Sequence, residues 1–171
     1  MVTCQILTLL ERRRIPFTTV HHRRAATAQH EAAAAHVQGR HWAKTVVCFA
    51  DGEAIQAVLP APCLVDLERL RRLAGSTSVR LATEREMEAM YPGCEPGTAP
   101  PLRPLFGQRV FLDESLLGDP EMVVNAGTRT DGICLHSSDF AELSEPIVGS
   151  FASWPVAASL NGARAAAARQ L

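Results

Sequence analysis

One lysine stands out among the residues that could do chemistry. The 171-residue chain carries sixteen arginines but a single lysine, Lys44, within the segment GRHWAKTVVCFADG. A lysine offers a compact ammonium with rotatable donors, or a titratable amine, and an arginine supplies neither. At the start of a predicted strand this group could bind a phosphate or carbonyl oxygen, or act as a desolvated nucleophile. The alternative is a surface lysine whose stem covers apolar residues while its ammonium reaches water.

Two short segments could build a ligand site near this lysine. The first is PGTAPP, in which Gly97 and Pro101 fit a G-x-x-x-P pattern and the neighbouring backbone amides could approach a ligand closely. The second is NAGT, residues 125–128, which ends a predicted strand and contains Gly127, a residue that permits close ligand approach. Each segment is also compatible with an ordinary connection, so neither is diagnostic alone.

Spacing disfavours a hydrolase triad and a metal centre. His136 is followed directly by Ser137, Ser138 and Asp139, but the members of a triad converge in space rather than in sequence, and no G-x-S-x-G motif is present. The five cysteines contain no C-x-x-C pair, and the histidines of residues 21–41 lack the acidic companion of a metalloprotease motif. No glycine-rich phosphate fingerprint follows a first strand. We therefore expect no metal and no cofactor.

Composition and charge limit the class of protein and its partners. A hydrophobic content of 47%, with no apolar run of the roughly 20 residues that span a membrane, predicts a single globular domain over residues 1–171 outside the membrane. The first arginines follow the N-terminal apolar stretch, the reverse of a secretory signal, which favours the cytoplasm. Residues 1–80 hold eleven Lys and Arg against six Asp and Glu, and residues 81–171 hold six against twelve. The basic first half could meet a polyanion, or could simply be solvated.

Periodicity and turn signals predict an α/β (α+β) domain with a mixed sheet. Asp51-Gly52 is a two-residue hairpin signal, Thr27 and Thr83 are helix caps, and Gly39 and Gly75 are helix stops. We expect helices over residues 4–14, 28–37, 66–74, 84–91 and 137–143, and strands over 15–22, 45–50, 53–59, 109–113, 121–127 and 132–136. Residues 91–107, rich in glycine and proline, are expected to be an irregular functional loop. The tail after Glu145 is expected to be a docked helix or frayed.

The order of several segments resembles one known family. AKT, AVLPA, DLERLRRLAG, RLATEREME, GTAPP, FLDESLL, NAGT and ICLHSSDFAEL follow one another as in the YbaK/prolyl-tRNA-synthetase-associated editing domains, over about residues 5–145. Thr45 follows the lysine, as in members resembling the cysteinyl-tRNA(Pro) deacylases. The resemblance implies a mixed, barrel-like sheet with surrounding helices.

The resemblance also implies a function. It points to a metal-free, trans-editing hydrolase that removes a wrong, small amino acid such as Cys, Ala or Ser from a tRNA end, with tRNA(Pro) as one candidate, after the synthetase has acted. Water, aided by the substrate's ribose hydroxyl, would be the nucleophile. By position, the implied residues are Lys44 for catalysis, Thr45, Gly97, Thr98, Ala99, Pro101, Asn125, Ala126, Gly127 and Thr128 for the substrate, and Arg23, Arg24 and Arg40 for tRNA.

Two other classes stay open. An enzyme of carbonyl chemistry would also need one special lysine, but acid and base residues should accompany it. A non-catalytic module that binds tRNA or a synthetase would need only the basic surface and the cleft. The expected partners are a mischarged tRNA and an aminoacyl-tRNA synthetase, with no role for DNA or a membrane.

Overall fold

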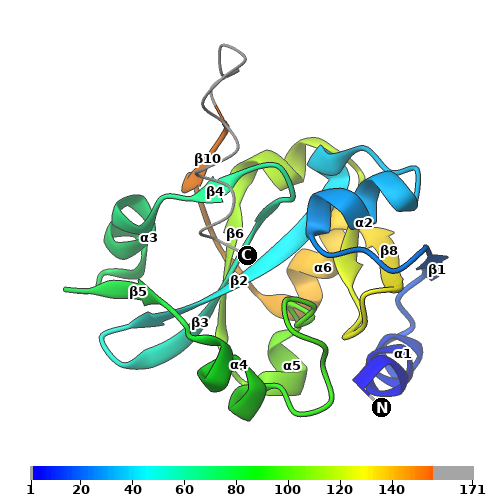
Figure 1. Ribbon diagram of the computed structural model, residues 1–171, viewed down its shortest axis with the longest axis horizontal. Coiled ribbons are helices and arrows are strands. Elements are labelled where there is room, and N and C mark those ends of the chain that lie inside the picture. The colour runs from blue at the N-terminus through cyan, green and yellow to red at the C-terminus, as the bar shows by residue number, and fades with distance from the viewer. Residues whose placement is uncertain (1, 156–171) are drawn as a thin grey trace.

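The computed structural model describes residues 2–155 as a mixed α/β fold (Figure 1). Its helices are α1 (Val2–Arg13), α2 (Ala28–Ala34), α3 (Leu67–Ala74), α4 (Glu84–Met90), α5 (Arg103–Phe106) and α6 (Ser137–Ser144). Its strands are β1 (Phe17–His21), β2 (Trp42–Ala50), β3 (Glu53–Pro60), β4 (Leu64–Val65), β5 (Val79–Leu81), β6 (Arg109–Asp113), β7 (Glu121–Asn125), β8 (Asp131–His136), β9 (Ile147–Gly149) and β10 (Ala152–Ser153). Within this range no helix has the length and apolar character that crossing a bilayer requires.

One mixed sheet organises the domain. Its strands lie in the order β1-β8-β7-β2-β3-β6-β9, with β5 also paired to β2, while β4 and β10 form a separate two-stranded sheet. β2 is antiparallel to β3 and β5 and parallel to β7, so the predicted mixed sheet is confirmed. The path is open, because β1 and β9 end it rather than pairing with each other. Figure 1 shows α3 and β5 at one end and α1, α2 and β1 at the other.

Local signals account for the boundaries of most elements. The side chains of Thr27 and Asp66 accept hydrogen bonds from the first turns of α2 and α3, as N-cap residues do. Thr83 and Glu86 form a reciprocal capping box at the start of α4. Asp51 and Gly52 have φ values of 48° and 88°, which the tight hairpin between β2 and β3 requires.

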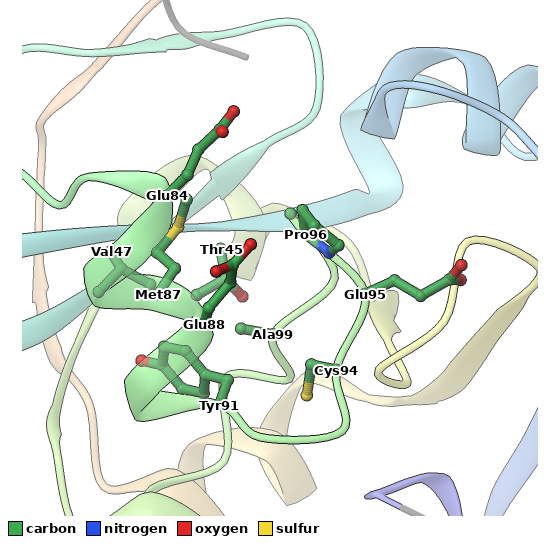
Figure 2. Close-up of a pocket in the computed structure, with 11 residues that line it drawn as sticks. Thr45, Val47, Glu84, Met87, Glu88, Tyr91, Cys94, Glu95, Pro96 and Ala99 are labelled. Carbon is green, nitrogen blue, oxygen red and sulfur yellow. The ribbon is translucent and has the colours of Figure 1, made fainter.

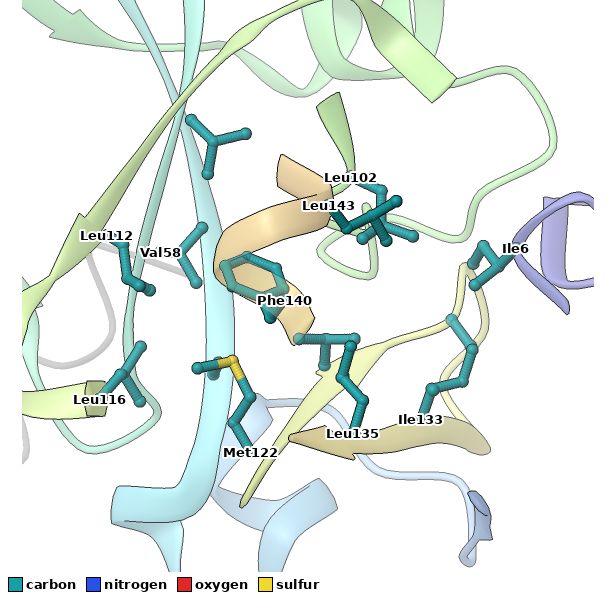
Figure 3. Packing of buried hydrophobic residues seen from close by; sticks show 14 of the residues in the cluster. Ile6, Val58, Leu102, Leu112, Leu116, Met122, Ile133, Leu135, Phe140 and Leu143 are labelled. Carbon is teal, nitrogen blue, oxygen red and sulfur yellow. The ribbon is translucent and has the colours of Figure 1, made fainter. Parts of the chain in front are cut away.

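Apolar side chains fill both faces of the sheet. One cluster lies under α1, α5 and α6, where Phe140 packs among side chains of β3, β6, β7 and β8 (Figure 3). A second cluster lies on the other face against α3, β4 and β10, with Phe111, Leu70 and Phe151 fully buried. Because side chains alternate along a strand, neighbouring residues of β2 enter different clusters.

Several boundaries differ from the prediction. α2 ends at Ala34 rather than near Gly39, because His36 adopts a left-handed φ of 57° and turns the chain. The proline-rich stretch 91–107 is irregular except for α5. The short strands β4, β5, β9 and β10 were not predicted. β9 and β10 lie after Glu145, in the segment expected to be a docked helix or frayed, and they form because they pair with β6 and β4. The rest of that tail, residues 156–171, lies outside the described residues.

Candidate functional site

The centre of β2 has an open edge. β7 pairs with β2 at Trp42 and Ala43 alone, and β5 pairs with it at residues 48–50. In an antiparallel pair, successive residues point their backbone N–H and C=O alternately toward and away from the partner strand. Because Trp42 C=O accepts from Ala61 N–H (2.8 Å) on the β3 side, the N–H and C=O of Thr45, three residues later, point away from β3. Neither group meets a partner within residues 2–155. The gap between β7 and β5 therefore leaves the backbone groups of Thr45 without a partner strand.

A small pocket, open to solvent on one side, lies beside this edge (Figure 2). Side chains of α4 form one side, and the loop 94–99 forms the other. The lining residues are Thr45, Val47, Glu84, Met87, Glu88, Tyr91, Cys94, Glu95, Pro96, Gly97 and Ala99. Three of the residues predicted to bind substrate, Thr45, Gly97 and Ala99, thus meet at one pocket.

The two predicted segments, GTAPP and NAGT, lie side by side. Glu95 N–H donates to Gly127 C=O (2.9 Å), and Gly127 N–H donates to Thr98 C=O (3.0 Å). Gly127 has a φ of 89° and Gly97 a φ of 81°, conformations that favour glycine. The NAGT turn therefore holds the pocket loop from behind rather than lining the pocket itself.

The side chain of Asn125 connects the loop to the sheet. Its Nδ2 donates to Gly97 C=O (3.2 Å), and its Oδ1 accepts from Trp42 Nε1 (2.8 Å). Asn125 is 1% exposed and Trp42 is 0% exposed, so both hydrogen bonds lie in a dry environment where an unpaired group would be costly. The position of Gly97 is thus set by a buried network.

The remaining predicted substrate residues are structural in this arrangement. Thr98 is buried and donates its N–H to Glu95 C=O, so this amide is not available to a ligand. Pro101 is buried beneath the loop, and Ala126 belongs to the core. The hydroxyl of Thr128 donates to the carboxylate of Asp131. These residues shape the loop and the turn without entering the pocket lining.

Lys44 lies on the face of β2 opposite to the pocket. It faces the second apolar cluster beside Cys63, because it alternates with Thr45 along the strand. Burial lowers the pKa of the Lys44 ammonium and raises that of the Cys63 thiol to about 11. No hydrogen bond or ion pair reaches the ammonium from the part of the chain that the structure describes. The backbone of β2 therefore lies between the Lys44 ammonium and the pocket.

The three arginines predicted to bind tRNA differ in their surroundings. Arg23 and Arg40 are exposed and have no carboxylate partner among residues 2–155. Arg24 instead forms an ion pair with Glu95 at the pocket loop (Nη2 to Oε1, 2.5 Å). The backbone N–H of Arg129 and the guanidinium of Arg24 lower the pKa of Glu95. Arg24 therefore supports the loop, whereas Arg40 Nε donates to His41 Nε2 (2.8 Å).

Sequence reasoning missed two residues that hold the site together. The Arg129 guanidinium donates to Pro96 C=O and Ala26 C=O (both 3.0 Å), which ties the pocket loop to the segment before α2. Glu31, on α2, is 3% exposed, and burial raises the pKa of its carboxyl to about 7 despite the attraction of Arg129. Its Oε2 is buried without a partner. The one available signal was an acidic residue in an otherwise alanine-rich helix.

Among the described residues, no three His, Cys, Asp or Glu side chains are grouped so as to hold a metal ion. The polar groups of the pocket are carboxylates, the Thr45 hydroxyl and backbone amides. These groups can orient an ester and its substituents, and the hydroxyl and the backbone N–H groups can stabilise negative charge on its carbonyl oxygen.

Comparisons with known proteins identify the family and the fold of the chain. Residues 22–143 match the family profile of the aminoacyl-tRNA editing domain. A proline–tRNA ligase of Nitratidesulfovibrio vulgaris (strain Hildenborough) is 35% identical over 83 residues, which are 48% of this chain and 14% of the ligase. The chain thus spans about a seventh of that relative.

Two solved structures share the fold. One, provisionally assigned as a trans-editing enzyme for prolyl tRNA synthetase, superposes with a TM-score of 0.75 at 22% identity, over 89% of this chain and 97% of the other. The hypothetical protein APE2540 superposes with a TM-score of 0.78 at 19% identity, over 87% and 99%. At these identities the superpositions show a shared fold, and the profile match shows the family. The chain therefore belongs to the aminoacyl-tRNA editing domain family.

Proposed function

We propose that this protein is a trans-editing hydrolase that deacylates tRNA mischarged with a small amino acid. One observation carries the proposal: the braced Gly97 loop and the open edge of β2 enclose a pocket in a chain of the editing family. The similarity to a proline–tRNA ligase and to the fold of a trans-editing enzyme supports tRNA(Pro) as the carrier.

The backbone of the pocket loop can stabilise the transition state. Pro96, Pro100 and Pro101 have no N–H, and Thr98 N–H is already bonded to Glu95 C=O. The N–H groups of Gly97 and Ala99 have no partner within the described residues and are the loop's available donors. Placed at the ester carbonyl, they would stabilise the negative charge that develops when water attacks. The new C–O bond forms to water, the ester bond breaks, and the ribose oxygen leaves with a proton.

The walls of the pocket favour a small side chain. Val47, Met87, the Tyr91 ring and Ala99 are apolar and lie around the space beside Thr45. The Tyr91 ring is held in place, because its hydroxyl accepts from Gln56 Nε2 (3.2 Å) and donates to Gln108 Oε1. It is therefore not expected to move aside for a larger side chain. A methyl, hydroxymethyl or sulfanylmethyl group is the expected occupant, so alanyl, seryl and cysteinyl esters are the proposed substrates.

The tRNA end would cross the open edge of β2. With the amino acid on the Thr45 face, the terminal ribose and its phosphate would reach the Lys44 face, where an unpaired, half-buried ammonium can meet an anion. Arg23 and Arg40 would contact phosphates further along the acceptor end. Lys44 would then position the ester through the ribose-phosphate rather than through the pocket.

A panel of charged tRNAs tests the proposal. Single-turnover hydrolysis should be measured for alanyl-, cysteinyl-, seryl-, prolyl- and phenylalanyl-tRNA(Pro), each corrected for spontaneous hydrolysis. We expect acceleration for the small, wrong amino acids and little for proline or phenylalanine. Tight binding of these tRNAs with no acceleration of any ester would instead identify a non-catalytic binding module.

A further inference from the structure

The ionisable side chains that line the pocket are all acidic. Those that are charged at neutral pH are Glu84, Glu88 and Glu95; Tyr91 and Cys94 also line the pocket, and the lining contains no lysine, arginine or histidine. Glu95 is neutralised by Arg24 and turns away from the pocket, whereas Glu84 and Glu88 line it from α4. The Glu88 carboxylate lies beside Thr45, and the Glu84 side chain points away from Thr45 at the outer rim (Figure 2). These two carboxylates are exposed, and neither forms an ion pair with any residue from 2 to 155. The mouth therefore carries two uncompensated negative charges.

Thr45 adds a separate indication of a ligand on the same side. Its Oγ1 is buried and has no hydrogen-bond partner, although Thr45 lines the pocket. Its backbone C=O points to the open edge and is also unpartnered within the described chain. A buried polar atom without a partner is costly, so an occupant of the pocket is expected to supply donors.

These groups together describe the chemistry of the occupant. Carboxylates and carbonyls are acceptors, so they bind a group with several N–H donors and a positive charge. In an aminoacyl ester, the α-ammonium is the group that meets this description. The same carboxylates repel phosphates, which keeps the tRNA backbone on the Lys44 face of β2.

We infer that the pocket selects the free α-ammonium of the aminoacyl ester through Glu84, Glu88 and the acceptors of Thr45, and rejects esters without this charge. The inference rests on the proposed function and narrows its substrate class. Blocked esters, such as those of N-acylated amino acids and of nascent peptides, would be excluded even when the side chain is small.

The test compares alanyl-tRNA with lactyl-tRNA, in which a hydroxyl replaces the ammonium at nearly constant size. Single-turnover rates at saturating and subsaturating enzyme are divided by the spontaneous rate of each ester, because the ammonium itself labilises the bond. The wild type should accelerate alanyl-tRNA at least about tenfold more than lactyl-tRNA, as expected for hydrogen bonds to charged groups. The double variant Glu84→Gln/Glu88→Gln should lose about fivefold on alanyl-tRNA and leave lactyl-tRNA within about twofold.

The variant Glu114→Gln/Glu142→Gln is the matched control, because both glutamates are exposed and outside the pocket lining. It should keep the preference of the wild type. Equal acceleration of both esters by the wild type would overturn the inference and leave the proposed function intact. Equal loss on both esters in the Glu84/Glu88 variant would overturn it too, because that result indicates a structural role. No acceleration of either ester would contradict the proposed function itself.

Discussion

Lys44 and Thr45 are consecutive in β2, yet the strand places their side chains on opposite faces, Thr45 at the pocket and Lys44 beside Cys63. One step along the chain thus separates the side that can hold an amino acid from the side that can hold an anion. The ester of a charged tRNA joins these two kinds of group. The proposed site therefore extends across an edge of the sheet rather than lying within one cavity.

Replacing Lys44 by Met should separate activity from stability. Methionine keeps the length of the side chain but removes the charge, so deacylation should fall about tenfold or more if the ammonium meets a phosphate. Burial lowers the pKa of Lys44 below its unfolded value, so the protonated lysine costs folding free energy that methionine does not. The melting temperature should stay constant or rise.

Lys44→Arg should also lose activity, because a wider group must fit beside fully buried Cys63. A fully active Lys44→Met variant would show that the ammonium is not needed for deacylation and that Lys44 only covers apolar residues.

Replacing Asn125 by Asp should displace the pocket loop. The new carboxylate can still accept from Trp42 Nε1, but it cannot donate to Gly97 C=O and would repel it. We expect a loss of about 1–3 kcal/mol in unfolding free energy and a roughly 10–100-fold fall in the single-turnover rate. Urea unfolding and the alanyl-tRNA assay measure the two effects. Unchanged kinetics would show that the bond to Gly97 does not position the loop.

Glu31 should make stability depend on pH. Its carboxyl has a pKa of about 7 when folded against 4.5 when unfolded, so the folded state binds the proton more tightly. This contribution is fully present below pH 4.5 and is lost as the pH rises through 7. Glu31→Gln should therefore match the wild type near pH 4.5 and exceed it at pH 8, by on the order of 2 kcal/mol.

Urea unfolding at several pH values measures this difference. Glu142→Gln, on an exposed face of α6, is the control and should run parallel to the wild type. A wild type and Glu31→Gln variant that differ by the same amount at both pH values would contradict the assignment.

Met87→Ala should widen the pocket. Met87 lines it from α4 and is partly buried against Tyr91 and Val47. Removing its thioether should let valyl- and leucyl-tRNA be hydrolysed about tenfold faster, the scale on which apolar pockets discriminate methylene groups. Alanyl-tRNA should change much less. An unaltered size preference would place the amino acid elsewhere.

Arg23 and Arg40 should govern the salt dependence of tRNA binding. If each contacts one phosphate, Arg23→Gln and Arg40→Gln should each reduce the slope of log K against log[salt] by roughly one. Arg69→Gln, on α3 at the other end of the sheet, should leave the slope unchanged. Deacylation that does not respond to ionic strength would remove the electrostatic account altogether.

The sequence was sufficient where structure depends on neighbouring residues. Asp51-Gly52, the helix stop at Gly75, and the pair Thr83 and Glu86 each define a turn or a helix end through local hydrogen bonds, so these boundaries were predicted correctly. The strands β5 and β9 are three residues long and form because they pair with β2 and β6. Segments this short have no local sequence pattern that predicts a strand.

In the site, too, features set by neighbouring residues could be predicted, and features set by distant contacts could not. The segments GTAPP and NAGT were identified from the sequence, but the hydrogen bonds that hold them together join residues about 30 apart, such as Asn125 and Gly97. The opposite orientation of Lys44 and Thr45 follows from strand alternation and could have been derived from the sequence. The pairing of Arg24 with Glu95 could not, because it depends on how the loop folds back.

The surroundings of Trp42 give the protein a spectroscopic reporter. The chain has two tryptophans, and Trp154 is 51% exposed whereas Trp42 is fully buried, with the His22 ring edge-on to it at 5.3 Å between centroids. In a Trp154→Phe variant, the remaining blue-shifted emission would come from an indole whose N–H is bonded to Asn125 and, through it, to the loop carbonyl of Gly97. Occupancy of the pocket should therefore be readable in real time from intrinsic fluorescence, without a label on either the protein or the tRNA.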